Sequence, residues 1–133
     1  MRAIIDLWGP SDLEMISPRV ARGEALTALF DATAEDYENP QPALKQALRD
    51  ASPLHQVTAK SPPVFIVHDG PADAASPTDP RISGSNMGAH SAAFGLALAA
   101  RLKQAGVSHE VIIAPDANRK FQQQAVQFLK RYL

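Results

Sequence analysis

The chain has 133 residues, 45% of them hydrophobic and 20% charged, which is the length of one domain or part of one and the composition of a folded globular protein. Its 13 basic and 14 acidic residues give a formal net charge of -1 with no basic run, so nucleic acid is not an expected partner. The absence of cysteine excludes disulfides, thiolate metal sites and a cysteine nucleophile.

The first half of the chain predicts one strand followed by helices. Residues 3–7 form an apolar run typical of a strand buried on both faces, and a Gly-Pro turn follows it. Ser11 or Asp12 can cap a short helical piece after that turn. Residues 22–30 and 42–52 carry apolar side chains at helical spacing. We therefore expect this part of the chain to be helical or looped, without a further strand.

The second half predicts two more strands and two helices. Residues 64–67 are β-branched or aromatic and predict a strand, and the polar residues 69–88 predict a long loop. Residues 88–106 predict a helix, 109–115 a third buried strand, and 118–133 a terminal amphipathic helix. The two helices have apolar stripes made of Phe94, Leu98 and Leu102, and of Phe121, Ala125, Phe128, Leu129 and Tyr132.

The alternation of strands and helices predicts an α/β fold in which helices flank a short, mainly parallel sheet. Three strands are fewer than the roughly 5–6 of an average sheet, and parallel strands are normally covered on both faces. We therefore expect an open sheet edge and a chain that forms part of a larger sheet. The apolar runs are far shorter than the roughly 20 residues that cross a bilayer, and Asp6 interrupts the N-terminal one. The sequence predicts a soluble chain without a signal peptide and does not specify its compartment.

Three segments resemble those of a known enzyme family. They read "AIIDLWGPSDL", "ASPLHQVTAKSPPVFIVHDGPAD" and "RLKQAGVSHEVIIAP". In this order they resemble the C-terminal half of an α/β-hydrolase, in particular the esterases related to feruloyl and acetyl-xylan esterases and the prolyl-oligopeptidase-like catalytic domains. The resemblance covers essentially the whole chain, and it implies that residues 1–133 are the C-terminal portion of a single α/β-hydrolase domain.

The same resemblance assigns roles to two residues. His68 falls on the histidine at the end of the family's strand, and Asp73 falls on the acid of the catalytic triad, with one extra residue between them. In a serine hydrolase such an acid orients an imidazole and stabilises the imidazolium that forms during acyl transfer. The implied activity is that of a serine-type carboxylic-ester hydrolase acting on small-molecule esters, with acetylated or feruloylated carbohydrate esters as the family's association.

Two departures from the family pattern make the chain catalytically incomplete as given. The G-x-S-x-G nucleophile elbow is absent from these residues, and the resemblance implies that it would lie upstream of Met1. The loop after the last strand carries Arg119 where the family has its catalytic histidine. An arginine stays protonated and has no lone pair with which to accept a serine proton. Whether the chain is an enzyme is therefore left open, and a truncated hydrolase or a degenerate copy would both have this sequence.

Other candidate residues have simpler explanations. His90 is the candidate for a substitute base, because it starts the helix after the acid's loop, where it could approach the carboxyl ends of the strands. His68 is otherwise a satisfied polar group at a strand end, and His55 and His109 are surface or strand-edge residues. Ser11 is a helix cap rather than a nucleophile. Trp8 is a core residue or a pocket wall.

No cofactor or metal is expected from the spacing of these residues. The glycine-spaced residues 84–88 follow a loop rather than a strand, which argues against a phosphate cradle. The histidines and acids show no i, i+4 pairing on a helix and have no cysteine partners, so we predict no metal site.

A second hypothesis belongs to a different class. The chain would then be a non-catalytic binding or assembly module that covers its open sheet edge with a partner or with a second copy of itself. Because the sheet lacks strands, we expect the chain expressed alone to expose apolar surface and to self-associate. Neither hypothesis involves a membrane.

Overall fold

A parallel three-stranded sheet forms the centre of the chain. The structure is a computed structural model that describes residues 2–16, 28–73, 90–114 and 121–132. Its strands are β1 (Ile4–Leu7), β2 (Val64–Asp69) and β3 (His109–Ala114), in the order β1-β2-β3. Both strand pairs are parallel, which confirms the α/β fold expected from the alternation of elements.

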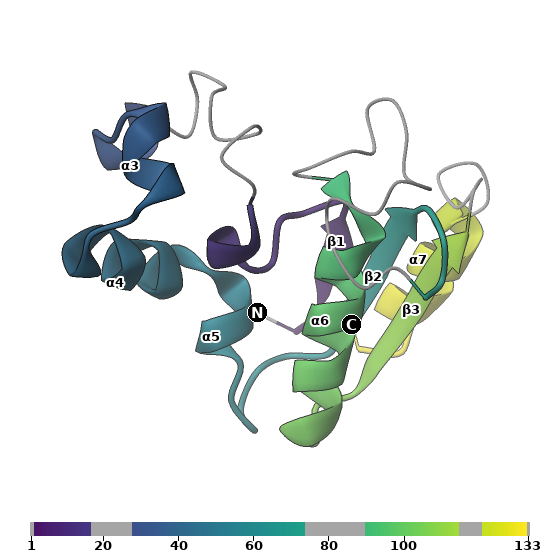
Figure 1. Ribbon diagram of the computed structural model, residues 1–133. Coiled ribbons are helices and arrows are strands. Elements are labelled where there is room, and N and C mark those ends of the chain that lie inside the picture. Colours follow the sequence, from purple (N-terminus) through teal and green to yellow (C-terminus); the bar gives the residue numbers. More distant parts are fainter. Residues whose placement is uncertain (1, 17–27, 74–89, 115–120, 133) are drawn as a thin grey trace.

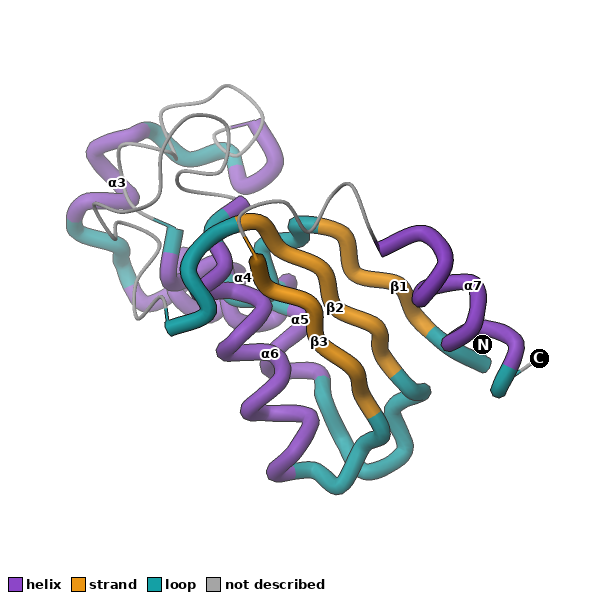
Figure 2. Tube along the Cα trace, turned by 90° about the vertical axis from the view of Figure 1, so that its right-hand side faces the viewer, coloured by secondary structure: helices purple, strands orange, loops and turns teal. Residues whose placement is uncertain are grey.

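The sheet is covered by one helix on each face. Helix α6 (Ala92–Gln104) lies against one face and helix α7 (Phe121–Lys130) against the other, as Figures 1 and 2 show from two directions. All six residues of β2 are buried, as the run of β-branched and aromatic side chains predicts for a central parallel strand. Phe65 and Val67 pack toward α7, and Ile66 packs toward α6.

Helix α6 has clear start and stop signals. Ser91 is the N-cap, and its Oγ accepts a hydrogen bond from the backbone N–H of Ala93 at 3.2 Å. The helix ends before Gly106, which has a φ of +71° that a side chain would disfavour. The predicted stripe of Phe94, Leu98 and Leu102 is buried. The expected start at residue 88 lies outside the described residues, and the structured helix begins at Ala92.

Helix α7 confirms most of the predicted terminal amphipathic helix. Ala125 and Phe128 are buried, and the Phe128 ring lies 5.4 Å from that of Phe65 and 5.0 Å from that of Tyr132, measured between ring centroids. Such aromatic contacts add to the burial of apolar surface between the helix and the sheet. None of the helices in the described ranges is long and apolar enough to cross a membrane.

Between β1 and β2 the described residues are helical or irregular, as predicted. The elements are η1 (Leu13–Met15), α3 (Ala34–Glu38), α4 (Pro42–Ala51) and α5 (Pro53–Gln56). They share a small core made of Leu13, Ile16, Tyr37, Leu48 and Phe94. Burial raises the pKa of the Tyr37 phenol within this core. Residues 28–30 are helical, but Leu29 is exposed and does not join the apolar face predicted for residues 22–30.

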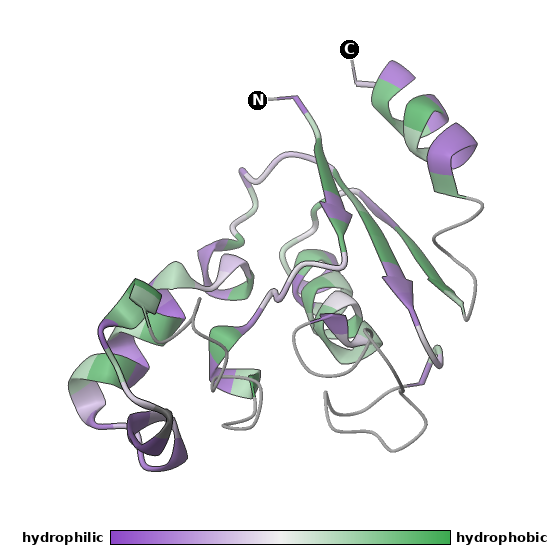
Figure 3. Ribbon diagram, turned by 90° about the horizontal axis from the view of Figure 1, so that it is seen from above, coloured by the Kyte–Doolittle hydropathy of each residue, from purple (hydrophilic) through white to green (hydrophobic). Residues whose placement is uncertain are grey.

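Hydropathy follows the same arrangement. Figure 3 shows hydrophobic residues along β1, β2 and β3 and on much of α6, while α3 is mainly hydrophilic. The sheet and its two covering helices therefore form the main hydrophobic core, and the segment from η1 to α5 packs beside α6 through Phe94.

Candidate active site at the carboxyl ends of the strands

A strained turn follows β1 at the edge where ligands usually bind in parallel sheets. Trp8 has a φ of +55°, a left-handed conformation that costs a residue other than glycine about 1–2 kcal/mol. Asp6 holds the turn, because its Oδ1 accepts a hydrogen bond from the N–H of Gly9 at 3.1 Å. A Cβ at position 9 would lie only 2.4 Å from the Asp6 Oδ1, so a larger residue there would displace the carboxylate that holds the turn.

His68 lies beneath this turn and is fully buried in β2. Its Nε2 is 3.8 Å from the Asp6 Oδ2, and its Nδ1 is 3.4 Å from the carbonyl oxygen of His90. Within the described part of the chain, neither the His68 Nε2 nor the Asp6 Oδ2 makes a hydrogen bond, although both are buried. The expectation of a satisfied polar group therefore holds for only one nitrogen of His68. Because the ring is enclosed, His68 positions its neighbours and does not reach a substrate.

Helix α6 packs directly against the His68 ring. Gly95 faces the imidazole so closely that a Cβ at this position would lie 2.5 Å from the His68 Cδ2. A glycine inside a helix is unfavourable by about 1 kcal/mol relative to alanine. Its presence in α6 is explained by this close approach of the helix to His68.

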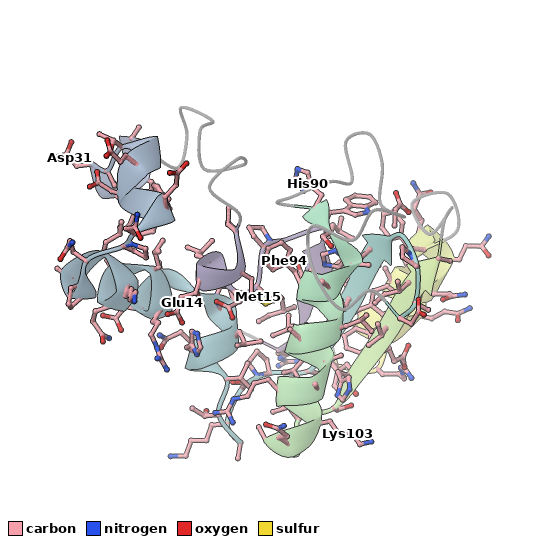
Figure 4. The ribbon with its side chains drawn as sticks, viewed as in Figure 1. Glu14, Met15, Asp31, His90, Phe94 and Lys103 are labelled. Atoms are coloured by element: carbon pink, nitrogen blue, oxygen red, sulfur yellow. The ribbon has the colours of Figure 1, made fainter. Side chains whose placement is uncertain are left out.

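His90, the predicted substitute base, lies at the same edge with its side chain exposed. Figure 4 shows it at the end of α6 nearest the carboxyl ends of the strands. Its Nδ1 is 2.9 Å from the carbonyl oxygen of Trp8. Since a carbonyl oxygen can only accept a hydrogen bond, the Nδ1 carries the proton in this contact. A neutral imidazole in this tautomer has its lone pair on Nε2, as a general base requires.

Asp73, the predicted triad acid, lies in the turn at residues 72 and 73, beyond the end of β2. Its side chain is exposed. The chain leaves β2 through Gly70, whose φ of +137° is accessible to glycine and strained for other residues. Asp73 and His90 thus belong to the same edge of the sheet, while His90 is oriented by Trp8. Arg119 and the glycine-spaced residues 84–88 lie outside the described residues.

The sequence offered either Ser11 or Asp12 as the cap of the short helix, and the structure shows that Asp12 is the cap. The Oδ1 of Asp12 accepts from the N–H of Glu14 at 3.0 Å, so Asp12 is the N-cap of η1. Ser11 is buried, and its hydroxyl donates to the carbonyl oxygen of Phe94 at 2.7 Å. Ser11 therefore joins η1 to α6 and is neither the cap nor an activated nucleophile.

An apolar pocket of about 360 Å³ opens beside β1. Its walls include Ile4, Val57, Val64, Leu98 and Leu102, and Asp6 contributes a polar group. The pocket therefore extends from the candidate site along the side of β1 that α6 covers only in part. Trp8 does not line it, and packs instead edge-on against Phe121 of α7, with ring centroids 5.9 Å apart.

The structure also gathers a group of side chains that the sequence spacing did not reveal. Asp12, Glu14 and His55 place one donor atom each within 4.8 Å of one another. Asp12 and Glu14 lie about forty residues before His55 in the chain, with α3 and α4 between them, so no short motif connects them. The sequence analysis treated His55 as a surface residue, whereas its Nε2 is buried and faces two carboxylates.

Comparison with known proteins relates the fold to a hydrolase. Neither the protein-family models nor the curated protein sequences compared with the chain match it. Among solved structures, it is similar to the acetyl ester-xyloside bifunctional hydrolase from Caldicellulosiruptor lactoaceticus, with a TM-score of 0.54 and 21% sequence identity. The match covers 98% of this chain and 38% of that hydrolase. The chain therefore shares its α/β fold with part of that hydrolase and spans less than half of its length.

Proposed function

We propose that the chain is the acid-bearing C-terminal portion of an α/β-hydrolase domain of the carboxylic-ester hydrolase type, and that it is catalytically incomplete as given. The proposal rests on one observation: β1 has a free edge and an apolar pocket beside it. The match of nearly the whole chain to 38% of a larger hydrolase supports it.

The hydrogen bonds of β1 show which of its edges is free. The N–H of Ile4 donates to the carbonyl of Pro63 at 2.9 Å, and the N–H of Trp8 donates to that of Val67 at 3.0 Å. Because the direction of backbone groups alternates along a strand, Ile5 and Leu7 direct theirs to the opposite edge. No strand within the described ranges pairs there. This edge is thus able to accept a further strand, and the pocket to accept apolar side chains that come with it.

The proposed chemistry uses the edge where Asp73 and His90 lie. A serine from a nucleophile-bearing part would attack the ester carbonyl, form an acyl-enzyme with release of the alcohol, and be freed by water. His90, with its lone pair on Nε2, is the proposed replacement for the base that Arg119 cannot provide. Asp73 would stabilise the resulting imidazolium. Acetylated carbohydrate esters are the proposed substrate class, which agrees with the name of the similar hydrolase.

An assay of p-nitrophenyl acetate hydrolysis by the purified chain tests whether the chain is catalytically incomplete. We expect no rate above that of the Asp73→Asn variant, since both lack a nucleophile elbow. Labelling with a fluorophosphonate, which modifies activated serines, is expected to give no adduct. Hydrolysis that Asp73→Asn abolishes would contradict the proposal, because it requires a nucleophile and a base within these residues.

The second candidate function is assembly through the same free edge. Leu7 of β1 is 40% exposed, and Val111 of β3, at the opposite edge of the sheet, is 38% exposed. Lysine at position 7 therefore tests pairing through β1, and lysine at position 111 is the matched control. If copies of the chain pair through β1, Leu7→Lys lowers the sedimentation-derived mass and Val111→Lys does not.

Binding of a hydrophobic dye tests the feature that both functions share. We expect the wild-type chain to bind the dye 8-anilinonaphthalene-1-sulfonate at the apolar surface beside β1. A monomer that unfolds cooperatively and binds no dye would contradict both the hydrolase-portion and the assembly proposals.

A further inference from the structure

The second histidine–carboxylate group of the molecule has the composition and spacing of a metal site. The Nε2 of His55 lies 3.3 Å from the Glu14 Oε2 and 3.7 Å from the Asp12 Oδ1. All three donor atoms lie within 4.8 Å of one another. Around a tetrahedral ion with ligand distances of about 2.0–2.2 Å, donor atoms are roughly 3.4 Å apart. The group therefore needs only small side-chain movements to surround an ion.

We propose that Asp12, Glu14 and His55 bind a first-row divalent metal ion, and that they bind Zn²⁺ more tightly than Mn²⁺. One imidazole and two carboxylates suit zinc among such ions, and the order of affinities places Zn²⁺ above Mn²⁺. This site is distinct from the candidate active site, because its residues come from η1 and α5 and lie outside the turns that carry His90 and Asp73.

The unpartnered nitrogen of His55 is the second observation that points to a ligand. The Nε2 is shut off from solvent and has no hydrogen-bond partner among the described residues, although it faces two carboxylates. A buried polar nitrogen without a partner is unfavourable. A metal ion would satisfy this nitrogen and both carboxylates at once.

The fold holds the ligands in place before an ion binds. Asp12 is fixed as the N-cap of η1 by the hydrogen bond from Glu14. The N–H of Leu13 donates to the Oγ of Ser52 at 2.8 Å, and the N–H of Leu54 donates to the carbonyl of Ser11 at 2.8 Å. These two bonds join η1 to the start of α5, which carries His55. Such fixed neighbours are the support that metal ligands require.

The local charge also favours a cation. Two carboxylates face the His55 Nε2, and the nearby guanidinium of Arg49 lies 3.6 Å from the Glu14 Oε2. The Arg49 side chain is more than half exposed, so it can turn to solvent when an ion occupies the site. Figure 4 shows Glu14 on the side of η1 that faces α4 and α5, which agrees with these contacts.

Isothermal titration calorimetry of the full chain with Zn²⁺ tests the proposal. We expect one ion per chain and weaker binding of Mn²⁺. His55→Ala should lower the affinity for Zn²⁺ by at least about tenfold, since even outer-shell changes cost about 10–100-fold. His109→Ala is the matched control, because its imidazole belongs to the start of β3 and is bound to the carbonyl of Val107. It should leave the affinity unchanged.

Two milder variants separate ligation from folding. Asp12→Asn keeps an oxygen that can cap η1, and Glu14→Gln keeps the shape of its side chain, yet each removes a carboxylate. Both should weaken Zn²⁺ binding while the far-ultraviolet circular dichroism stays unchanged. The proposal is overturned if the wild-type chain binds no Zn²⁺, or if these variants and His55→Ala bind it as tightly as His109→Ala does.

Discussion

Two histidine–carboxylate groups in the described part of the chain differ in their exposure to solvent. The Asp6–His68 pair lies under α6, and the His68 side chain is fully buried. The group of Asp12, Glu14 and His55 lies at the surface, where the His55 side chain is 27% exposed. The first pair therefore fixes the strand ends and the turn that orients His90. The second group includes the exposed Glu14 side chain, although the His55 Nε2 itself is buried. The same residue types thus have different roles because α6 covers one group and not the other.

Removing Asp6 should break the enclosed pair with the largest effect. Asp6→Ala leaves the Gly9 N–H without its acceptor and the His68 Nε2 without a facing carboxylate. The Gly9 N–H that loses its acceptor costs about 1–3 kcal/mol, so we expect a loss of about 2 kcal/mol in the free energy of unfolding, measured with urea. Asp6→Asn retains an oxygen for Gly9 and should lose about half as much. Equal stability of Asp6→Ala and the wild type would show that the pair fixes nothing.

Gly95→Ala should disturb the close packing of α6 against the His68 ring. Helix propensity alone would stabilise α6 by about 1 kcal/mol, whereas the contact of the new methyl group with His68 should cost about 1–3 kcal/mol. We expect net destabilisation by about 1–2 kcal/mol in urea unfolding. In the background of His68→Ala the same substitution has no ring to displace. In that background Gly95→Ala should raise the free energy of unfolding. If it lowers the free energy of unfolding there as well, the proposed contact between position 95 and the His68 ring is wrong.

His55→Ala should have a small effect on stability when no metal is present. The contacts of His55 with Asp12 and Glu14 are partly exposed to solvent, and such pairs contribute less than about 1 kcal/mol. Urea unfolding in the presence of a chelator checks this expectation. If His55→Ala lowers the free energy of unfolding as much as Asp6→Ala does, the group of Asp12, Glu14 and His55 stabilises the fold as strongly as the Asp6–His68 pair.

Asp36 differs from the carboxylates of these two groups, because its hydrogen-bond donors are the neutral groups of Thr33. The hydroxyl and the backbone N–H of Thr33 donate to it, both at 2.7 Å, and they lower the pKa of Asp36 below its usual 3.8. The stabilisation is present above pH 3.8 and is lost as the pH falls through the lower pKa of the folded state. Titration of the carboxyl carbon by NMR should show this pKa rising toward 3.8 in Thr33→Ala but remaining low in Thr33→Ser.

Local patterns in the sequence were enough to predict the elements and fold class. The apolar runs at Val64 and His109 form the expected parallel strands, and the stripe of Phe94, Leu98 and Leu102 is buried as expected. Within the described residues α6 begins at Ala92, because the Ser91 side chain caps it. His90 was predicted at the strand ends from topology, since parallel strands bring their carboxyl ends to one edge, whereas Asp73 was assigned by the family resemblance.

The sequence by itself determined the periodicity, the breaks between elements and the absence of a nucleophile elbow, because these depend on residues close together in the chain. Only the tertiary structure decided that His68 faces Asp6, that His90 is oriented by Trp8, and that His55 faces two acids from η1. These contacts join residues far apart in the chain. Strand register and the packing of helices set such contacts, and neither leaves a local pattern in the sequence.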